Sequence, residues 1–246
     1  MNELLLLAIG AAIAGFVQGI TGFAFGMVAM SIWVWGIEPQ TAAVMSVCGG
    51  LTGQILSALT IRRGLHLSLL WPFLLGGLLG IPIGVLLLPH LNPAHFKLIL
   101  GGVLVVCCPA MLFAAGLPKL EWGGRWGDAL AGSLGGVMGG IGGFTGAAPA
   151  VWGTLRGYTK DAHRAMLQNF NLAALSATLI ALIASGVVKQ EMLPKYAVVA
   201  PALILPSILG ARVYVGLSPA AFRKVVLTVF TFAGVAMIVA AILQSH

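Results

Sequence analysis

Amide and hydroxyl side chains lie within two glycine-rich phrases, and the backbone of these phrases could bind an anion. The phrases are GFVQGITGFAFG at residues 15–26 and GVMGGIGGFTGA at residues 136–147. A helix that breaks at such a phrase leaves amide donors without intrahelical partners, and glycine lets a ligand approach that backbone closely. Because exposed N–H groups and the helix dipole both attract anions, we predict that the two phrases together form an anion site.

The candidate substrate-binding residues lie in these phrases and in two neighbouring apolar segments. They are Gln18, Gly19, Thr21, Gly22, Gln54, Gly140, Gly142, Gly143, Phe144, Thr145, Asn169 and Asn171. Each glycine could instead allow close helix packing, and each polar side chain could satisfy a freed backbone carbonyl or a neighbouring helix. Three arginines could form an electrostatic access path or serve only to fix the orientation in the membrane: Arg156, Arg164 and Arg212.

Composition identifies the environment in which these residues work. The chain is 59% hydrophobic and 8% charged, whereas soluble domains are about 45–50% apolar and about 25% charged. A polytopic membrane protein is therefore expected. Its net charge of +7 is spread over short clusters between apolar segments, which favours lipid and a small anionic substrate as partners and disfavours nucleic acid.

Catalytic and metal-binding motifs are missing from the sequence. The histidines have no ligand spacing, and the glycine phrases lack the Lys-Ser/Thr ending of a nucleotide loop. We therefore expect no catalytic residue, no metal and no cofactor. All six acidic residues fall near predicted loops or segment ends, which disfavours a cation exporter, since cation carriers usually need intramembrane carboxylates.

The chain is duplicated. The two phrases align without gaps at an offset of 121, and LNPAHFK at 91–97 matches LSPAAFR at 217–223 at an offset of 126. Both pairs occur in the same order, as a repeat requires. Glycine-interrupted apolar segments at equivalent places in two halves indicate the binding site of a secondary transporter.

Apolar stretches divide the chain into elements. They cover residues 3–35, 41–60, 67–88 and 97–115 in a first repeat (1–116), and 128–155, 164–186, 194–214 and 221–243 in a second repeat (128–246), with a cytoplasmic linker at 117–127. Six are near the ~20 residues that a spanning helix needs. The first stretch of each repeat is longer and carries a glycine phrase, so it is either one long broken helix or a hairpin.

Charge decides between these two possibilities. If each long stretch crosses the membrane once, the 13 basic residues divide almost evenly between the two sides. If each is a hairpin, ten basic residues share one side (Arg62, Arg63, Lys119, Arg125, Arg156, Lys160, Arg164, Arg212, Arg223, Lys224) and three lie opposite (Lys97, Lys189, Lys195). The positive-inside rule favours the hairpins and places both termini outside the cytoplasm.

The predicted fold class follows from that topology. Each half becomes a glycine-broken helical hairpin plus three transmembrane helices, which is an odd number of crossings. The second half must then be inverted relative to the first. We predict an all-α integral membrane protein of two inverted-topology repeats.

The two phrases also carry a family resemblance. GFVQGITGFAFG and GGIGGFTGAAP resemble motifs of the TauE/SafE family of sulfite and organosulfonate exporters, also called the toluene-sulfonate uptake permease family. The resemblance covers the whole chain and implies transport, commonly outward, of sulfite, sulfoacetate or sulfonates across the bacterial inner membrane. It implies substrate contacts at 18–22 and 140–145. The commoner family version has a denser glycine run where this chain has Phe23-Ala24-Phe25.

These observations lead to one functional expectation and two alternatives. We expect a secondary transporter that works by alternating access and is not an enzyme. The alternatives are a passive anion channel and, less favoured, an integral membrane lipid-handling enzyme. Assembly as a homodimer is left open.

Overall fold

The computed structural model describes residues 2–60, 64, 66–113, 119–213 and 219–244, which form helices and no strand. Arg62, Arg63, the helix ends expected at 114–115 and 214, and residues 117–118 of the expected linker lie outside the described residues. Within the described part, six helices are long and apolar enough to span a membrane: Glu3–Thr21, Pro39–Leu59, Leu67–His90, Pro93–Phe113, Asp161–Ala184 and Gln190–Arg212. The chain is a multi-pass, all-helical membrane protein.

Within the described residues, each half of the chain contributes five α-helices. The first half has α1 (Glu3–Thr21), α2 (Phe25–Trp33), α3 (Pro39–Thr60), α4 (Leu67–Leu87) and α5 (Pro93–Phe113), with a 3₁₀ turn at Leu88–His90. The second has α6 (Gly124–Gly142), α7 (Ala147–Leu155), α8 (Lys160–Ala184), α9 (Leu193–Val213) and α10 (Pro219–Gln244), with a 3₁₀ turn at Gln190–Met192. Three helices begin at a proline, whose fixed φ and missing N–H suit the first helical position.

Both glycine-broken stretches fold back on themselves. The indole Nε1 of Trp33, at the end of α2, donates to the carbonyl oxygen of Leu6 near the start of α1 at 3.2 Å. In the second half, Trp152 near the end of α7 donates to Asp128 in the first turns of α6 at 2.7 Å. The backbone N–H of Leu120 also donates to the carbonyl of Leu155 at 2.9 Å. Each stretch is therefore a helical hairpin with its break at the far end.

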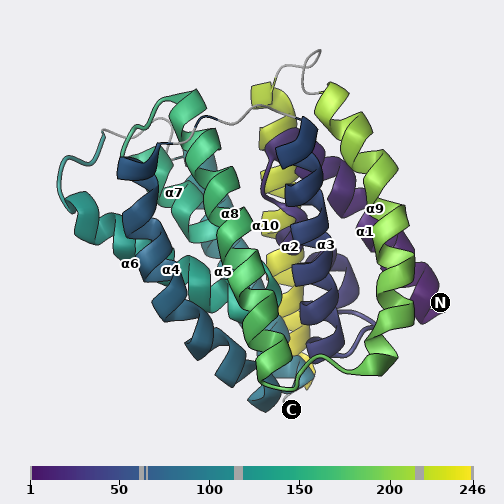
Figure 1. Cartoon of the computed structure of the whole chain (residues 1–246). Coiled ribbons are helices and arrows are strands. Elements are labelled where there is room, and N and C mark those ends of the chain that lie inside the picture. The colour runs from purple at the N-terminus through teal and green to yellow at the C-terminus, as the bar shows by residue number, and fades with distance from the viewer. Residues whose placement is uncertain (1, 61–63, 65, 114–118, 214–218, 245–246) are drawn as a thin grey trace.

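Helices from different halves pack together most closely. α4 packs along α6, α1 along α9, and α5 along α10. In Figure 1, α4 and α6 lie at one edge of the bundle and α1 and α9 lie at the opposite edge. The α4–α6 contact is backbone to backbone, because a Cβ at Gly76, Gly80 or Gly84 would overlap a carbonyl oxygen of α6.

The two ends of the bundle hold different loops. One, which we call the N-terminal end, brings together Glu3, the α2–α3 loop and the α8–α9 loop, where Lys195 pairs with Glu3. A cavity of about 400 Å³ opens there. The opposite end, the linker end, holds residues 119–123 and the start of α6. Arg125 of α6 lies over the Trp71 ring of α4 at this end, with 5.6 Å between guanidinium carbon and ring centroid.

Candidate functional site

The first break, Gly22–Ala24, separates α1 from α2. Gly22 has a φ of 85°, and its N–H donates to the carbonyl of Gln18 at 2.7 Å. This left-handed conformation favours glycine, which has no Cβ. The Thr21 hydroxyl donates to the carbonyl of Val17 at 2.9 Å and accepts from the amides of Phe23 and Ala24 at 3.5 and 3.3 Å. Thr21 therefore caps the break from within.

The second break, Gly143–Gly146, separates α6 from α7. Gly143 has a φ of 76°, and its N–H donates to the carbonyl of Gly139 at 2.7 Å, as at the first break. The Thr145 hydroxyl donates to Oδ1 of Asn171 at 2.6 Å. Ser46 of α3 donates to the carbonyl of Gly142 at 2.8 Å. Two long helices, α3 and α8, thus hold this break in place.

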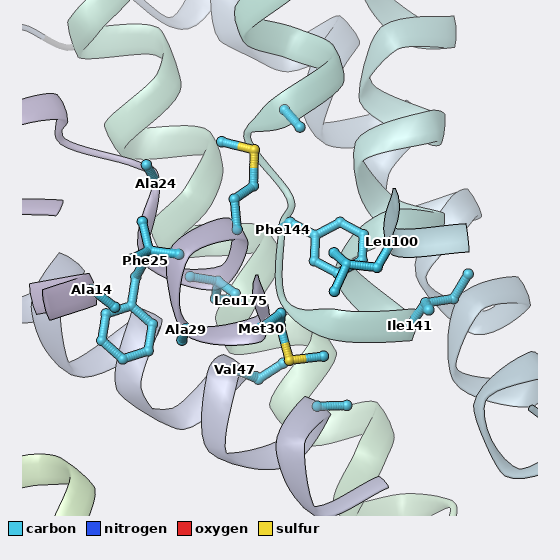
Figure 2. Packing of buried hydrophobic residues seen from close by; sticks show 14 of the residues in the cluster. Ala14, Ala24, Phe25, Ala29, Met30, Val47, Leu100, Ile141, Phe144 and Leu175 are labelled. Atoms are coloured by element: carbon cyan, nitrogen blue, oxygen red, sulfur yellow. The ribbon is translucent and has the colours of Figure 1, made fainter. Parts of the chain in front are cut away.

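The two breaks meet inside the bundle. A Cβ at Gly26, in the first turn of α2, would lie 2.5 Å from the carbonyl oxygen of Gly143 and 3.1 Å from the amide nitrogen of Phe144. A Cβ at Gly146 would lie 3.1 Å from the Phe23 ring. Figure 2 shows the apolar side chains that fill the space beside this contact, among them Phe25, Met30 and Phe144. The two breaks are therefore in direct contact, and a substrate site at this place stays a prediction.

Three glutamines surround the first break. Gln18 donates to the carbonyl of Gly50 at 3.1 Å, and Gln54 donates to the carbonyl of Gly22 at 2.7 Å. Gln168 of α8 donates to the Ser57 hydroxyl at 3.3 Å, and its Nε2 would lie 3.1 Å from a Cβ at Gly22. All three are buried. The Oε1 of Gln18 has no hydrogen-bond partner in the described structure.

Asn171 and two threonines surround the second break. Asn171 is 1% exposed, and its Nδ2 would lie 2.8 Å from a Cβ at Gly146. Thr178, which is fully buried, is near Gly139 and Thr145. Asn171 and Thr178 are seven residues apart, so they lie on one face of α8. Neither the Nδ2 of Asn171 nor the hydroxyl of Thr178 has a hydrogen-bond partner in the part of the chain that the structure describes.

Three of the expected ligands lie elsewhere. Gly19 packs against the α9 backbone at Ser207, and Gly140 packs against α4 at Gly84. Asn169 donates to the carbonyl of Gly64 at 3.1 Å, near the linker end. The structure therefore brings together Gln18, Thr21, Gly22, Gln54, Gly142, Gly143, Phe144, Thr145 and Asn171.

The three arginines occupy the linker end. Arg156 donates through Nη1 to the backbone carbonyls of Leu120, Glu121 and Trp122 at 3.2, 3.3 and 3.5 Å, so it fastens the linker to α7. Arg164 is half-buried in the first turns of α8, and Arg212 is exposed near the end of α9. An access path along these residues stays a prediction.

A buried carboxylate holds the open end of the second hairpin. Asp128 is 4% exposed and accepts from Trp152 Nε1 at 2.7 Å and from the Tyr158 hydroxyl at 2.8 Å. Burial raises the pKa of Tyr158 to about 12 from its ordinary 10.0; the hydrogen bond to Asp128 adds to the rise and Arg156 opposes it. In the described part, no group of three His, Cys, Asp or Glu could hold a metal ion.

Asp128→Asn is expected to destabilise the protein by about 1.5–3 kcal/mol, because hydrogen bonds to a charged group contribute that much. The loss should appear as a lower melting temperature of the purified protein in detergent, with Asp161→Asn at an exposed position as control. Equal melting temperatures of Asp128→Asn and Asp161→Asn would contradict this role of Asp128.

Tyr158 should make stability depend on pH. Because its folded-state pKa is raised, Tyr158 contributes stability that is fully present below pH 10 and is lost as pH rises through about 12.

Sequence reasoning missed Ser46 and Thr178 and did not include Gln168 among the ligands. Ser46 and Thr178 lie in segments that carry further hydroxyls, among them Thr52 and Ser176, and a hydroxyl in a membrane helix usually bonds to the helix itself or to a neighbour. The available signal for Gln168 was its position three residues before Asn171, which places both on one helix face.

Comparison with known proteins bears on the whole chain. No curated protein and no solved structure matches it. The family model described as sulfite exporter TauE/SafE matches residues 7–237, nearly the full length, and this match confirms the resemblance that the glycine phrases indicated. The chain belongs to the TauE/SafE sulfite exporter family, a family of membrane transporters.

Proposed function

We propose that this protein exports small sulfur-containing anions, such as sulfite, sulfoacetate or sulfonates, by alternating access, and that it binds them where its two helix breaks meet. One observation supports the site above all: the first turn of α2 lies directly against the Gly143–Phe144 peptide. Irregular backbone at membrane depth is tolerated only where it is buried or lines a cavity. Two such segments in contact are characteristic of a transporter's central site.

Mirror-related contacts support an inverted repeat. Gly136 packs against Gly77, and Gly15 packs against Leu203. Gly15 and Gly136 are related by the offset of 121, and their partners Gly77 and Leu203 are related by the offset of 126. The pairs Gly84–Val137 and Gly210–Phe16 obey the same two offsets. Such exchange of partners is expected if residues 1–116 and 128–246 are repeats related by a two-fold axis, joined by a linker at 117–127.

The orientation that we propose puts the linker end in the cytoplasm. Lys119, Arg125, Arg156 and Arg212 lie at that end, whereas Lys97, Lys189 and Lys195 lie at or near the N-terminal end. This imbalance supports a cytoplasmic linker and both termini outside, in the bacterial inner membrane. In a negative-inside cell, the membrane potential then favours export of an anion by a free energy of about 2.3 kcal/mol per charge per 100 mV.

The moving parts in this proposal combine elements of both repeats. The backbone contacts of α1 with α9 and of α6 with α4 leave no room for a side chain at several glycines. Closely packed interfaces have low compressibility and transmit strain. Each hairpin should therefore move with the helix of the other repeat on which it lies, and alternate opening should occur where the two breaks touch.

Flux through proteoliposomes tests the proposal. Vesicles loaded with unlabelled sulfite should accumulate radiolabelled sulfite from outside, and the initial rate should saturate with concentration. Saturation with counterflow indicates a carrier, whereas a rate that rises linearly without counterflow would indicate a channel. The proposal fails if sulfite, sulfoacetate and methanesulfonate all cross at the rate of protein-free vesicles.

A further inference from the structure

The two breaks differ at one equivalent position. The offset of 121 pairs Thr21 with Gly142, and pairs the amides of Phe23 and Ala24 with those of Phe144 and Thr145. In the first break, the Thr21 hydroxyl accepts from both amides. In the second break, Gly142 has no side chain, and the Phe144 ring covers it instead. Among the described residues no group accepts from the amides of Phe144 and Thr145.

Side chains add two further donors at the second break. The Nδ2 of Asn171 lies beside Gly146, the residue that caps the nine-residue helix α7. The hydroxyl of Thr178 faces Gly139 and Thr145. Both groups are buried and have no hydrogen-bond partner in the described structure. Native proteins rarely leave a buried hydrogen-bond donor without an acceptor. Several such donors beside one helix N-terminus therefore indicate a ligand with acceptor oxygens.

We propose that the second break alone forms the anion-binding half of the site, and that Thr21 closes the first break against anions. The proposal rests on the function proposed above and makes its site asymmetric. Backbone amides, Asn171 and Thr178 supply only uncharged donors at this break. Such a set suits the oxygens of a sulfonate or sulfite group, because several donors can converge on oxygens that share one charge.

The first break has the opposite chemistry. The Nε2 of Gln18 is engaged by the carbonyl of Gly50, which fixes Oε1 as the atom without a partner, and that atom is an acceptor. The carbonyl of Gly22 is also an acceptor and already receives Gln54. An acceptor-rich surface repels an anion but suits an O–H such as that of hydrogen sulfite. In this proposal the charged oxygens of the substrate therefore lie on the side of the second break.

Two threonine variants separate a one-sided site from a symmetric one. Thr178→Val removes a hydroxyl that has no partner in the structure, so it should leave the melting temperature unchanged or raise it while weakening sulfite binding about tenfold, equivalent to about 1.4 kcal/mol. Thr21→Val removes no donor to the anion and uncovers the amides of Phe23 and Ala24, so sulfite affinity should be no lower than in the wild type. Thr154→Val is the matched control, because its hydroxyl bonds to Ala150 within α7.

Calorimetric titration of each purified variant with sulfite measures these affinities and decides between a one-sided and a symmetric site. Loss of affinity in Thr21→Val with none in Thr178→Val, or equal loss in both, would overturn the one-sided site. If Thr21→Val does not fold, Asn171→Asp replaces it: a carboxylate beside the free amides should reduce affinity more than tenfold, and unchanged affinity would reject the proposal. If the wild type binds neither sulfite nor methanesulfonate, the proposed function itself has failed.

Discussion

Gly26→Ala is expected to reduce transport at least tenfold while the protein still reaches the membrane. The added methyl would lie 2.5 Å from the carbonyl oxygen of Gly143 and 2.8 Å from its carbonyl carbon. That peptide cannot move aside, because α3 holds it from behind: a Cβ at Gly143 would lie 2.7 Å from the Ser46 hydroxyl and 3.0 Å from the backbone nitrogen of Val47. The two breaks must then separate, and the site between them changes shape.

The matched control is Gly102→Ala in α5. A Cβ at Gly102 meets nothing within 4 Å, so the substitution tests the effect of a helical methyl group without the contact. Sulfite counterflow should persist in Gly102→Ala and fall in Gly26→Ala, at equal amounts of reconstituted protein. Full transport by Gly26→Ala would show that the meeting of the breaks has no part in the site.

The positions of both helix breaks could be predicted from the sequence. Gly22 and Gly143 occupy equivalent places in the two phrases, and both adopt the left-handed conformation at the end of a long helix. The reason is local, since glycine alone pays little for positive φ. Length and apolar composition likewise predicted five of the six candidate spanning helices within the described part, whereas the sixth, Glu3–Thr21, was expected as one arm of a hairpin. These features depend on residues close together in the chain.

The partner of each glycine could not be predicted. Gly19 and Gly140 were expected at the substrate, yet they pack against α9 and α4. Gly15 and Gly19 are four residues apart, as are Gly136 and Gly140, and this spacing places each pair on one helix face. Spacing thus reveals a smooth face but not what covers it. The covering helix comes from the other half of the chain, and only the tertiary fold specifies it.

The roles of the two threonines were equally hidden. Thr21 and Thr145 each stand near a break and looked alike as candidate ligands. In the structure, Thr21 bonds to its own segment, whereas Thr145 bonds to Asn171 on another helix. A short hydroxyl side chain can bond to its own backbone or to a neighbouring element, and either bond satisfies the hydroxyl. The choice depends on whether a distant partner is within reach.

Gly84→Ala and Gly210→Ala are expected to destabilise the protein by similar amounts, each about 1–3 kcal/mol or more. A Cβ at Gly84 would overlap the carbonyl oxygen of Val137, and a Cβ at Gly210 would overlap that of Phe16. Carbonyl oxygens within a helix cannot turn away, so the helices must move apart along their whole contact. Melting temperature and detergent-resistant folded fraction, measured by fluorescence size-exclusion, report the loss.

The similarity of the two effects tests the duplication as well as the packing. Gly84 and Gly210 differ by 126, and Val137 and Phe16 differ by 121, so an inverted repeat makes the two contacts copies of each other. Gly102→Ala should instead be neutral or stabilising by up to about 1 kcal/mol, because alanine favours a helix over glycine. A large loss for one variant and none for its counterpart would mean that the two hairpins are held by different means. In that case, the hairpin whose contact tolerates the substitution would not be expected to move together with its partner helix.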